Sequence, residues 1–174
     1  MAAKTFLRLV SGRITEILGI TTSAGAGDDG KIPALDSTGR LDVTFMPVGV
    51  GPDVKIFPTS ENLTAGNWVN TYDAGAGVMT ARKADATAAG KEAKGYVLAN
   101  TTSPANATVY FGGINKALTG LTVGAEYFLD TTAGAGVATT PPSGVGKVVQ
   151  RLGSAISTTE IEVDLVDLGI VLAA

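Results

Sequence analysis

Apolar and polar positions alternate along most of the chain, and this pattern predicts short β-strands. In residues 4–18, two runs of alternating character flank Ser11 and Gly12, where the chain can turn back on itself. We therefore expect a β-hairpin in this segment. Apolar side chains lie on both of its expected faces, and a lone hairpin cannot bury them, so the hairpin must pack against something else.

The same kind of pattern returns near residue 55 and continues to about residue 166. Candidate strands, separated by clusters of Gly, Asn and Pro, are 55–58, 67–72, 77–82, 95–100, 107–112, 125–130, 136–140, 145–152 and 160–166. Many short strands joined by tight turns are typical of a small β-barrel or β-sandwich. The predicted fold class is all-β: an N-terminal extended arm or hairpin, followed by a small antiparallel β-barrel or sandwich.

The segments between these regions have the composition of loops. Residues 19–30 are rich in Gly, and 36–39 read as a turn in which Asp36 bonds its own backbone. Asp42 can cap one helical turn that Pro47 ends. Residues 84–94 could form a short helix, but Gly90 weakens it and we expect a surface loop. We divide the chain into an arm (1–53), a β-domain (54–167) and an apolar C-terminal tail (168–174).

Composition narrows the possible chemistry. The 174 residues include no His and no Cys, with 45% hydrophobic and 17% charged residues. Ser-His-Asp and Cys-His catalysis, His-based zinc sites and disulfides therefore cannot be built from this sequence. We expect a protein that is not an enzyme, with no catalytic site, no cofactor, no metal site and no small-molecule substrate.

Charge and hydropathy argue against two classes of partner. The net charge is −3, and no basic patch is visible, so nucleic acid is not an expected partner. The longest apolar run is far short of a membrane span, so we expect no membrane partner either. The N-terminus lacks the pattern of a signal peptide.

Three motifs have both a functional and a structural interpretation. Residues 25–30 match G-x-G-x-x-G, but Pro33 follows where a helix is needed, which favours a plain loop. Asp28 and Asp29 lack the alternating ligands of a calcium loop and are better interpreted as a solvated turn. The acidic residues Glu160, Glu162, Asp164 and Asp167 could form a carboxylate pair. Their alternation with apolar residues instead indicates a strand with an acidic outer face.

The aromatic residues leave one further alternative open. Trp68 is the only tryptophan, and the tyrosines are Tyr72, Tyr96, Tyr110 and Tyr127. They could line a glycan-binding face. We favour the alternative that they anchor the core or an interface, because aromatic side chains bury the most area per residue.

Residues 30–47, GKIPALDSTGRLDVTFMP, resemble a segment common in bacteriophage virion proteins, both head decoration proteins and tail fibres. The preceding residues 23–28 also resemble decoration-type proteins. Residues 117–129 and 144–153 are similar to β-barrel domains of phage structural proteins. The resemblance implies a homotrimer with an entwined N-terminal arm and a β-barrel head, bound to the major capsid protein on the outer surface of the virion.

The arm carries apolar residues with little mass of its own to bury them, so burial between chains would be favourable. Folding back onto its own β-domain is the alternative. The candidate capsid or subunit contacts are Phe6, Leu7, Leu9, Ile14, Ile17, Leu41, Phe45, Met46, Ile170 and Leu172. The expected function is a capsid decoration, or cement, protein that stabilises the head. The alternative is a tail-fibre-tip protein that recognises a glycan on the host surface.

Overall fold

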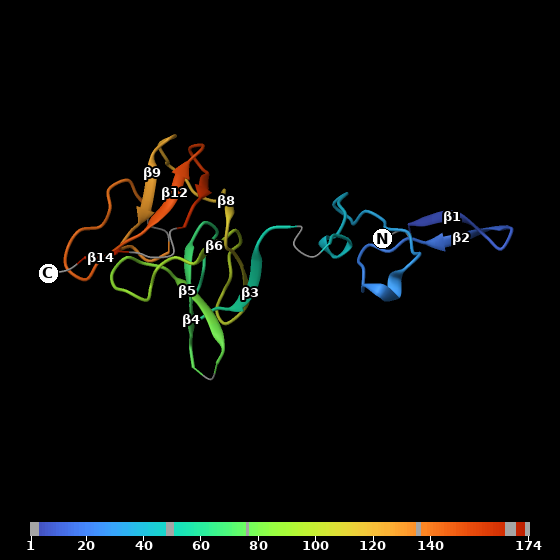
Figure 1. Cartoon of the computed structure of the whole chain (residues 1–174), viewed down its shortest axis with the longest axis horizontal. Coiled ribbons are helices and arrows are strands. Elements are labelled where there is room, and N and C mark those ends of the chain that lie inside the picture. Colours follow the sequence, from blue (N-terminus) through green and yellow to red (C-terminus); the bar gives the residue numbers. More distant parts are fainter. Residues whose placement is uncertain (1–3, 48–50, 76, 135–136, 166–169, 173–174) are drawn as a thin grey trace. The chain divides into compact units, whose positions relative to one another are not determined.

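The computed structural model describes residues 4–47, 51–75, 77–134, 137–165 and 170–172, and it is almost entirely β (Figure 1). The chain divides into two compact units, Met1–Gly51 and Pro52–Ala174. This division falls two residues before the boundary expected between arm and β-domain. The expected tail is not a separate unit, because it belongs to the second one.

The first unit contains the predicted hairpin. Strands β1 (Thr5–Val10) and β2 (Arg13–Leu18) pair antiparallel, and their register places Leu9 opposite Ile14. Ser11 and Gly12 both have positive φ, 50° and 79°, which is the backbone of a tight two-residue hairpin turn.

Two short 3-10 turns follow the hairpin. They are η1 (Ala26–Asp28) and η2 (Val43–Phe45). The side chain of Asp42 accepts a hydrogen bond from the backbone N–H of Thr44, so the capped turn before Pro47 is confirmed. The segment that matched G-x-G-x-x-G contains only the three-residue turn η1 within an otherwise irregular loop.

Five strands of the second unit form a curled antiparallel sheet. They are β3 (Val54–Pro58), β4 (Trp68–Asp73), β5 (Met79–Lys83), β6 (Gly95–Val97) and β7 (Asn106–Tyr110), in the order β3-β7-β6-β4-β5. The two edges meet in a parallel bridge between Thr59 and Ala81, where the Ser60 N–H donates to the Ala81 carbonyl at 3.1 Å. The sheet thus closes into a small barrel around a buried cluster that includes Val69, Val97 and Val109.

A second sheet also contains five strands. They are β8 (Gly113–Asn115), β9 (Glu126–Leu129), β10 (Val137–Ala138), β12 (Arg151–Ala155) and β13 (Ile161–Val163), in the order β10-β9-β12-β13-β8. A separate ladder joins β11 (Val148–Val149) to β14 (Ile170–Val171). Part of the expected tail therefore pairs with its own domain, while residues 168–169 and 173–174 lie outside the described residues.

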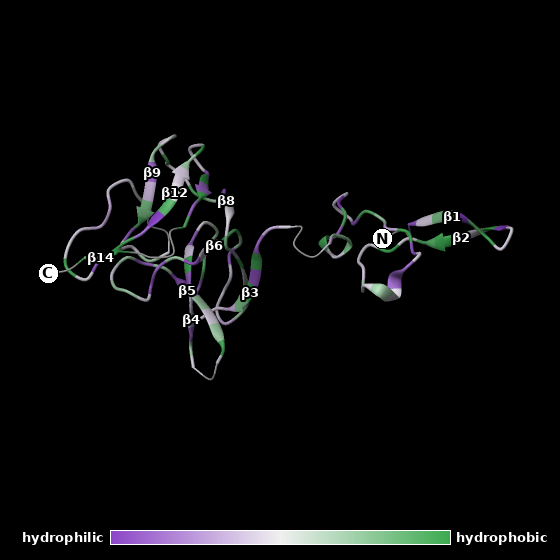
Figure 2. Ribbon diagram, viewed as in Figure 1, coloured by the Kyte–Doolittle hydropathy of each residue, from purple (hydrophilic) through white to green (hydrophobic). Residues whose placement is uncertain are grey.

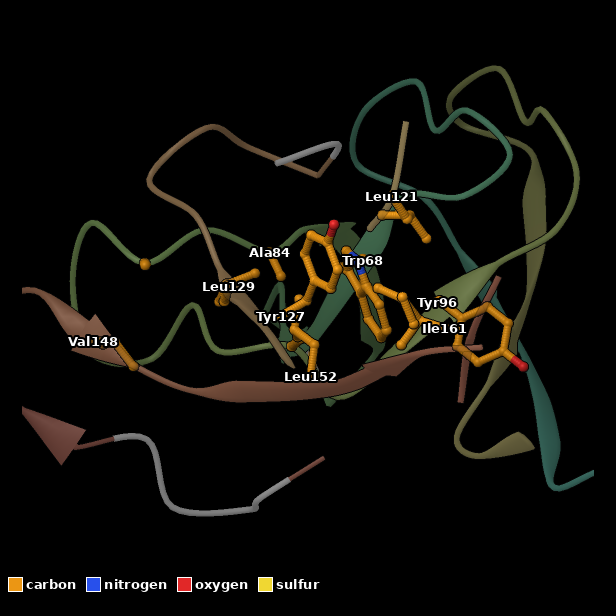
Figure 3. Packing of buried hydrophobic residues seen from close by; sticks show 12 residues of the cluster. Trp68, Ala84, Tyr96, Leu121, Tyr127, Leu129, Val148, Leu152 and Ile161 are labelled. Atoms are coloured by element: carbon orange, nitrogen blue, oxygen red, sulfur yellow. The ribbon is translucent and has the colours of Figure 1, made fainter. Parts of the chain in front are cut away.

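The main core lies between the barrel and the second sheet (Figure 3). Trp68 and Tyr96 project from the barrel, with ring centroids 5.8 Å apart, and Leu152 projects toward them from the second sheet. The indole N–H of Trp68 has no hydrogen-bond partner among the described residues, although it is fully buried. The β-domain therefore combines both expected architectures, because a small barrel forms one layer of a sandwich.

The segment 84–94 is a loop, as expected, and its middle, residues 88–90, is exposed, but its two ends reach into the core. Ala84, Ala86 and Ala93 are all buried in the main core. Alanine side chains are small enough to lie between the two layers, and the backbone around them is held by hydrogen bonds to neighbouring segments, such as Val148 N–H to the Ala86 carbonyl.

Candidate interaction surface

The two faces of the hairpin β1–β2 differ in how far they are covered. The strand register places Leu7, Leu9, Ile14 and Leu18 on one face, which we call the leucine face, together with Thr5 and Glu16. Leu7 and Ile14 are each 75% exposed, and Leu9 and Leu18 are also largely exposed. Apolar residues colour both strands of the hairpin in Figure 2. Four large apolar side chains thus lie bare on one small two-stranded sheet.

The loop that follows the hairpin contacts only part of the opposite face, where Phe6 and Val10 are still 38% and 44% exposed. The ring of Phe6 lies so close to Gly19 that a Cβ built there would be 2.5 Å from the ring. The Arg8 guanidinium donates a hydrogen bond to the carbonyl of Gly30 at 2.7 Å. Among the described residues of the first unit, Ala34 alone is buried. The arm therefore has a defined local structure but almost no core.

Aspartate side chains hold the loops of the arm in shape. Hydrogen bonds from the Lys31 ammonium and the Ala24 N–H lower the pKa of Asp28 below its usual 3.8. The Arg40 N–H and the Thr38 hydroxyl lower the pKa of Asp36 in the same way. All these bonds favour the carboxylate form, so the turns are most stable when the aspartates are charged.

The pKa of Asp42 is also lowered, mainly by the N–H and then the hydroxyl of Thr44. This cap fixes the turn η2 within the segment 30–47. Next to it, Leu41 and Met46 are exposed, as is Val43, whereas Phe45 is half-buried.

The remaining candidate contacts fall in different places. Phe6 and Ile17 lie on the opposite face of the hairpin, where Phe6 is 38% exposed and Ile17 is half-buried. Ile170 is exposed on β14, while Leu172 is half-buried and its backbone bonds Gly146 and Lys147 of the same domain. The structure therefore brings only Leu7, Leu9 and Ile14 of the candidates together on one bare face.

Leu18 belongs to the leucine face but was not among the candidates. The two-residue turn at Ser11 and Gly12 fixes the register of the hairpin, which sets Leu18 opposite Thr5 and beside Leu7. The information needed to include it was therefore present in the sequence.

The aromatic residues are mainly core residues, in line with the favoured alternative. Trp68, Tyr96 and Tyr127 are buried, so these three cannot form a glycan-binding face. Tyr72 and Tyr110 are half-buried. Among the tyrosines, Tyr72 and Tyr110 are therefore the two with surface left to contact a ligand.

The acidic strand near the C-terminus has the expected two faces. Ile161 is buried and Glu162 is exposed, and the carboxylate of Asp164 pairs with Arg151 of the same chain. Arg151 also pairs with Glu126 at 3.1 Å, which makes the cluster a surface ion-pair network. Asp167 lies outside the described residues. Within the described ranges, no group of three or more acidic side chains is placed to hold a metal ion.

No helix in the described part of the chain is long and apolar enough to cross a membrane. In comparisons with known proteins, no protein-family model, no curated protein and no solved structure matches the chain.

Proposed function

We propose that this chain is a structural, non-catalytic protein of a bacteriophage particle. It binds the outer surface of the capsid as a homotrimer and stabilises the shell, in the manner of a decoration or cement protein. The observation that carries the proposal is the arm: its hairpin has a bare leucine face, and among the arm residues that the structure describes Ala34 alone is buried. The resemblance of residues 30–47 to phage virion proteins supplies the class of particle and the number of subunits.

The energetics favour a partner for this face. Fully burying a Leu or Ile side chain contributes about 1.5–3 kcal/mol. Leu7 and Ile14 are each 75% exposed, and Leu9 and Leu18 are 68% and 62% exposed. Covering all four would therefore contribute about 4–8 kcal/mol for each chain. This is a useful fraction of the free energy that a specific protein complex needs, which is about 8–12 kcal/mol for micromolar to nanomolar affinity.

Shell stabilisation follows from preferential binding. A protein that binds the assembled capsid and not the dispersed subunits lowers the free energy of the assembled state, by an amount that grows with its concentration relative to Kd. A trimer presents three arms, so several weak contacts act together through a high effective concentration. In this proposal the arms bind the capsid and the β-domain faces away from the capsid surface.

The leucine face can be tested with a double variant that keeps the tendency to form strands. Leu9→Thr with Ile14→Thr makes the centre of the face polar, while threonine remains a good strand residue. The matched control is Val123→Thr with Val145→Thr, which replaces two exposed valines of the β-domain, 61% and 69% exposed. Analytical ultracentrifugation would compare the three proteins. We expect wild type and control to be trimers and the arm variant to shift toward monomer.

Binding to the head is measured by co-sedimentation with capsids assembled without this protein. Wild type and the valine control should bind and raise the temperature at which the heads open, and the arm variant should do neither. If the arm variant forms trimers and binds heads as well as wild type, the proposed role of the leucine face is wrong.

Immunogold labelling of intact virions tests the location itself. Gold spread over the head supports the decoration function. Gold confined to the tail end would replace it with the tail-fibre-tip function, and a particle without gold would exclude both.

A further inference from the structure

A hollow of about 330 Å³ lies on the outer side of the barrel, over strands β6 and β7. It is lined by Leu98, Ala99, Asn100, Thr101, Asn106, Thr108 and Tyr110. Val97 and Val109 pair across the two strands and are buried in the barrel, so the alternating neighbours Leu98 and Thr108 face outward. Strand β7 therefore forms one side of the hollow, and residues 98–101, which directly follow β6, form the other.

The lining is polar but carries no charge. The Asn106 amide and the hydroxyls of Thr108 and Tyr110 make no hydrogen bond to any described residue. The Asn100 side-chain carbonyl accepts a bond from the Ala65 N–H at 2.9 Å, which holds the amide in place and leaves its own N–H groups to donate. These groups together can donate and accept hydrogen bonds, as a ligand rich in neutral hydroxyls requires.

The aromatic ring in the hollow is held in position before any ligand arrives. Tyr110 stacks on Tyr96, with ring centroids 5.5 Å apart and planes inclined by 20°. Tyr96 is itself buried, and its hydroxyl donates to the Gly112 carbonyl at 3.0 Å. A ring fixed in this way loses little conformational entropy on binding.

The neighbouring strand adds an apolar border. Ile56 of β3 lies directly opposite Thr108 and is 63% exposed. An amphipathic ligand could therefore rest apolar C–H groups on Tyr110 and Ile56 and direct its hydroxyls to the polar side chains. A pyranose ring has this combination of one apolar face and a polar edge.

We propose that this hollow binds a neutral pyranose residue of a polysaccharide. The volume is at the lower end for small-molecule sites, which suits one sugar unit better than a long segment. The absence of charged side chains from the lining disfavours sialic and uronic acids, whose carboxylates require a cationic partner. The inference goes beyond the proposed shell-stabilising function and is independent of it. Each site is expected to be weak, with Kd of about 1 mM, and repeated copies would add avidity.

The test is a ¹H–¹⁵N NMR titration of the full chain with individual methyl pyranosides. The neutral probes are the glucoside, galactoside, mannoside and N-acetylglucosaminide, and glucuronic acid and sialic acid are the acidic ones. We expect at least one neutral sugar to shift the amide signals of residues 98–110 in a saturable manner, and the acidic sugars to shift them less.

Two conservative variants test the contacts. Thr108→Val and Tyr110→Phe each remove one hydroxyl and keep the shape, and each should weaken binding about five- to tenfold, the effect of one lost hydrogen bond. The control is Thr158→Val, which removes an exposed threonine hydroxyl outside the lining and should leave Kd unchanged.

Three results would overturn the proposal: no saturable shift with any neutral sugar, shifts centred outside residues 98–110, or unchanged affinity in both hollow variants. The amide spectrum of each protein without sugar shows that it is folded before the titration begins. Since the titration uses free protein, its failure is also distinct from a failure of capsid binding.

Discussion

The buried side-chain amide of Gln150 forms two hydrogen bonds with the backbone of a distant loop, and replacing Gln150 with leucine should strongly destabilise the β-domain. Its side-chain carbonyl accepts the Ala93 N–H at 2.7 Å, and its amide N–H donates to the Ala93 carbonyl at 2.9 Å. Gln150 and Ala93 are 2% and 3% exposed, so water cannot readily replace either bond. The pair ties the loop 84–94 to the segment between β11 and β12.

The size of the effect follows from the two backbone groups of Ala93 that would lose their partner. Leaving a buried donor or acceptor unpaired costs about 1–3 kcal/mol, so two such groups cost about 2–6 kcal/mol. The extra apolar burial of leucine offsets about 1 kcal/mol or more of this. We expect a net loss of about 1–5 kcal/mol, which is a large part of the 5–15 kcal/mol that typically stabilises a domain. At about 4 °C per kcal/mol, Tm should fall by about 4–20 °C.

The assay is urea unfolding followed by fluorescence. Trp68 is the only tryptophan and is fully buried in the β-domain, so its emission reports on this domain alone. The matched control is Asn62→Ala, which removes an exposed amide that accepts the Ser103 N–H at 3.0 Å. Water can replace that bond, so the control should lose about 1 kcal/mol or less. If Gln150→Leu were no more destabilising than Asn62→Ala, the reasoning from the two buried hydrogen bonds would be refuted.

Three further predictions concern single residues of the β-domain. Gly153→Ala should lower the free energy of unfolding by more than about 3 kcal/mol, measured by urea unfolding. A Cβ at this position would lie 2.0 Å from the Glu162 carbonyl oxygen, and the φ of 147° is itself strained for alanine. A near-neutral result would contradict the packing of β12 on β13. Burial opposes ionisation of Asp85, but the hydrogen bonds and the nearby ammonium that favour its carboxylate outweigh this and lower its pKa below 3.8. Its stabilisation is therefore complete above that value and is lost as pH falls through the folded pKa, and Asp85→Asn should flatten the acid limb of a plot of stability against pH. Arg151→Gln breaks the exposed ion pairs with Asp164 and Glu126 and should cost about 1 kcal/mol or less. This cost should shrink further on adding salt, because salt screens exposed charges. A loss of several kcal/mol would show that the network is more than a surface feature.

Local features of the arm could be predicted from its sequence because they depend on residues close together in the chain. The hairpin needs only two alternating runs and a turn at Ser11 and Gly12, and the cap at Asp42 needs only the N–H of Thr44. Such structures are decided by backbone geometry and short-range hydrogen bonds. The same reasoning located most strands of the β-domain.

Features that depend on a distant partner were predicted less well. The strand candidate 145–152 stopped before Gly153, because glycine usually marks a turn. In the structure β12 continues through it to Ala155, and glycine is required there by the close approach of the β13 backbone. The loop 84–94 was expected at the surface, where its middle does lie, whereas Gln150 holds Ala93 near its end in the core from 57 positions away.

The exposure of the aromatic residues also depends on distant partners and could not be predicted from nearby residues. Tyr96 and Tyr110 lie directly opposite each other on β6 and β7 and stack, yet Tyr96 is buried and Tyr110 is half-buried. Their sequence contexts do not distinguish a core ring from a ring in a binding hollow. The difference comes from where the second sheet covers the barrel, which is a property of the packed layers.

The sequence by itself determined the all-β class, the hairpin, the capped turn and the absence of histidine and cysteine chemistry. Each of these depends on residue type and on spacing of a few positions. Only the tertiary structure decided which hairpin face stays bare, how the edges of β3 and β5 close the barrel, and which rings are buried. Those outcomes require contacts between segments tens of residues apart, and the free energy of such contacts depends on how whole surfaces fit together.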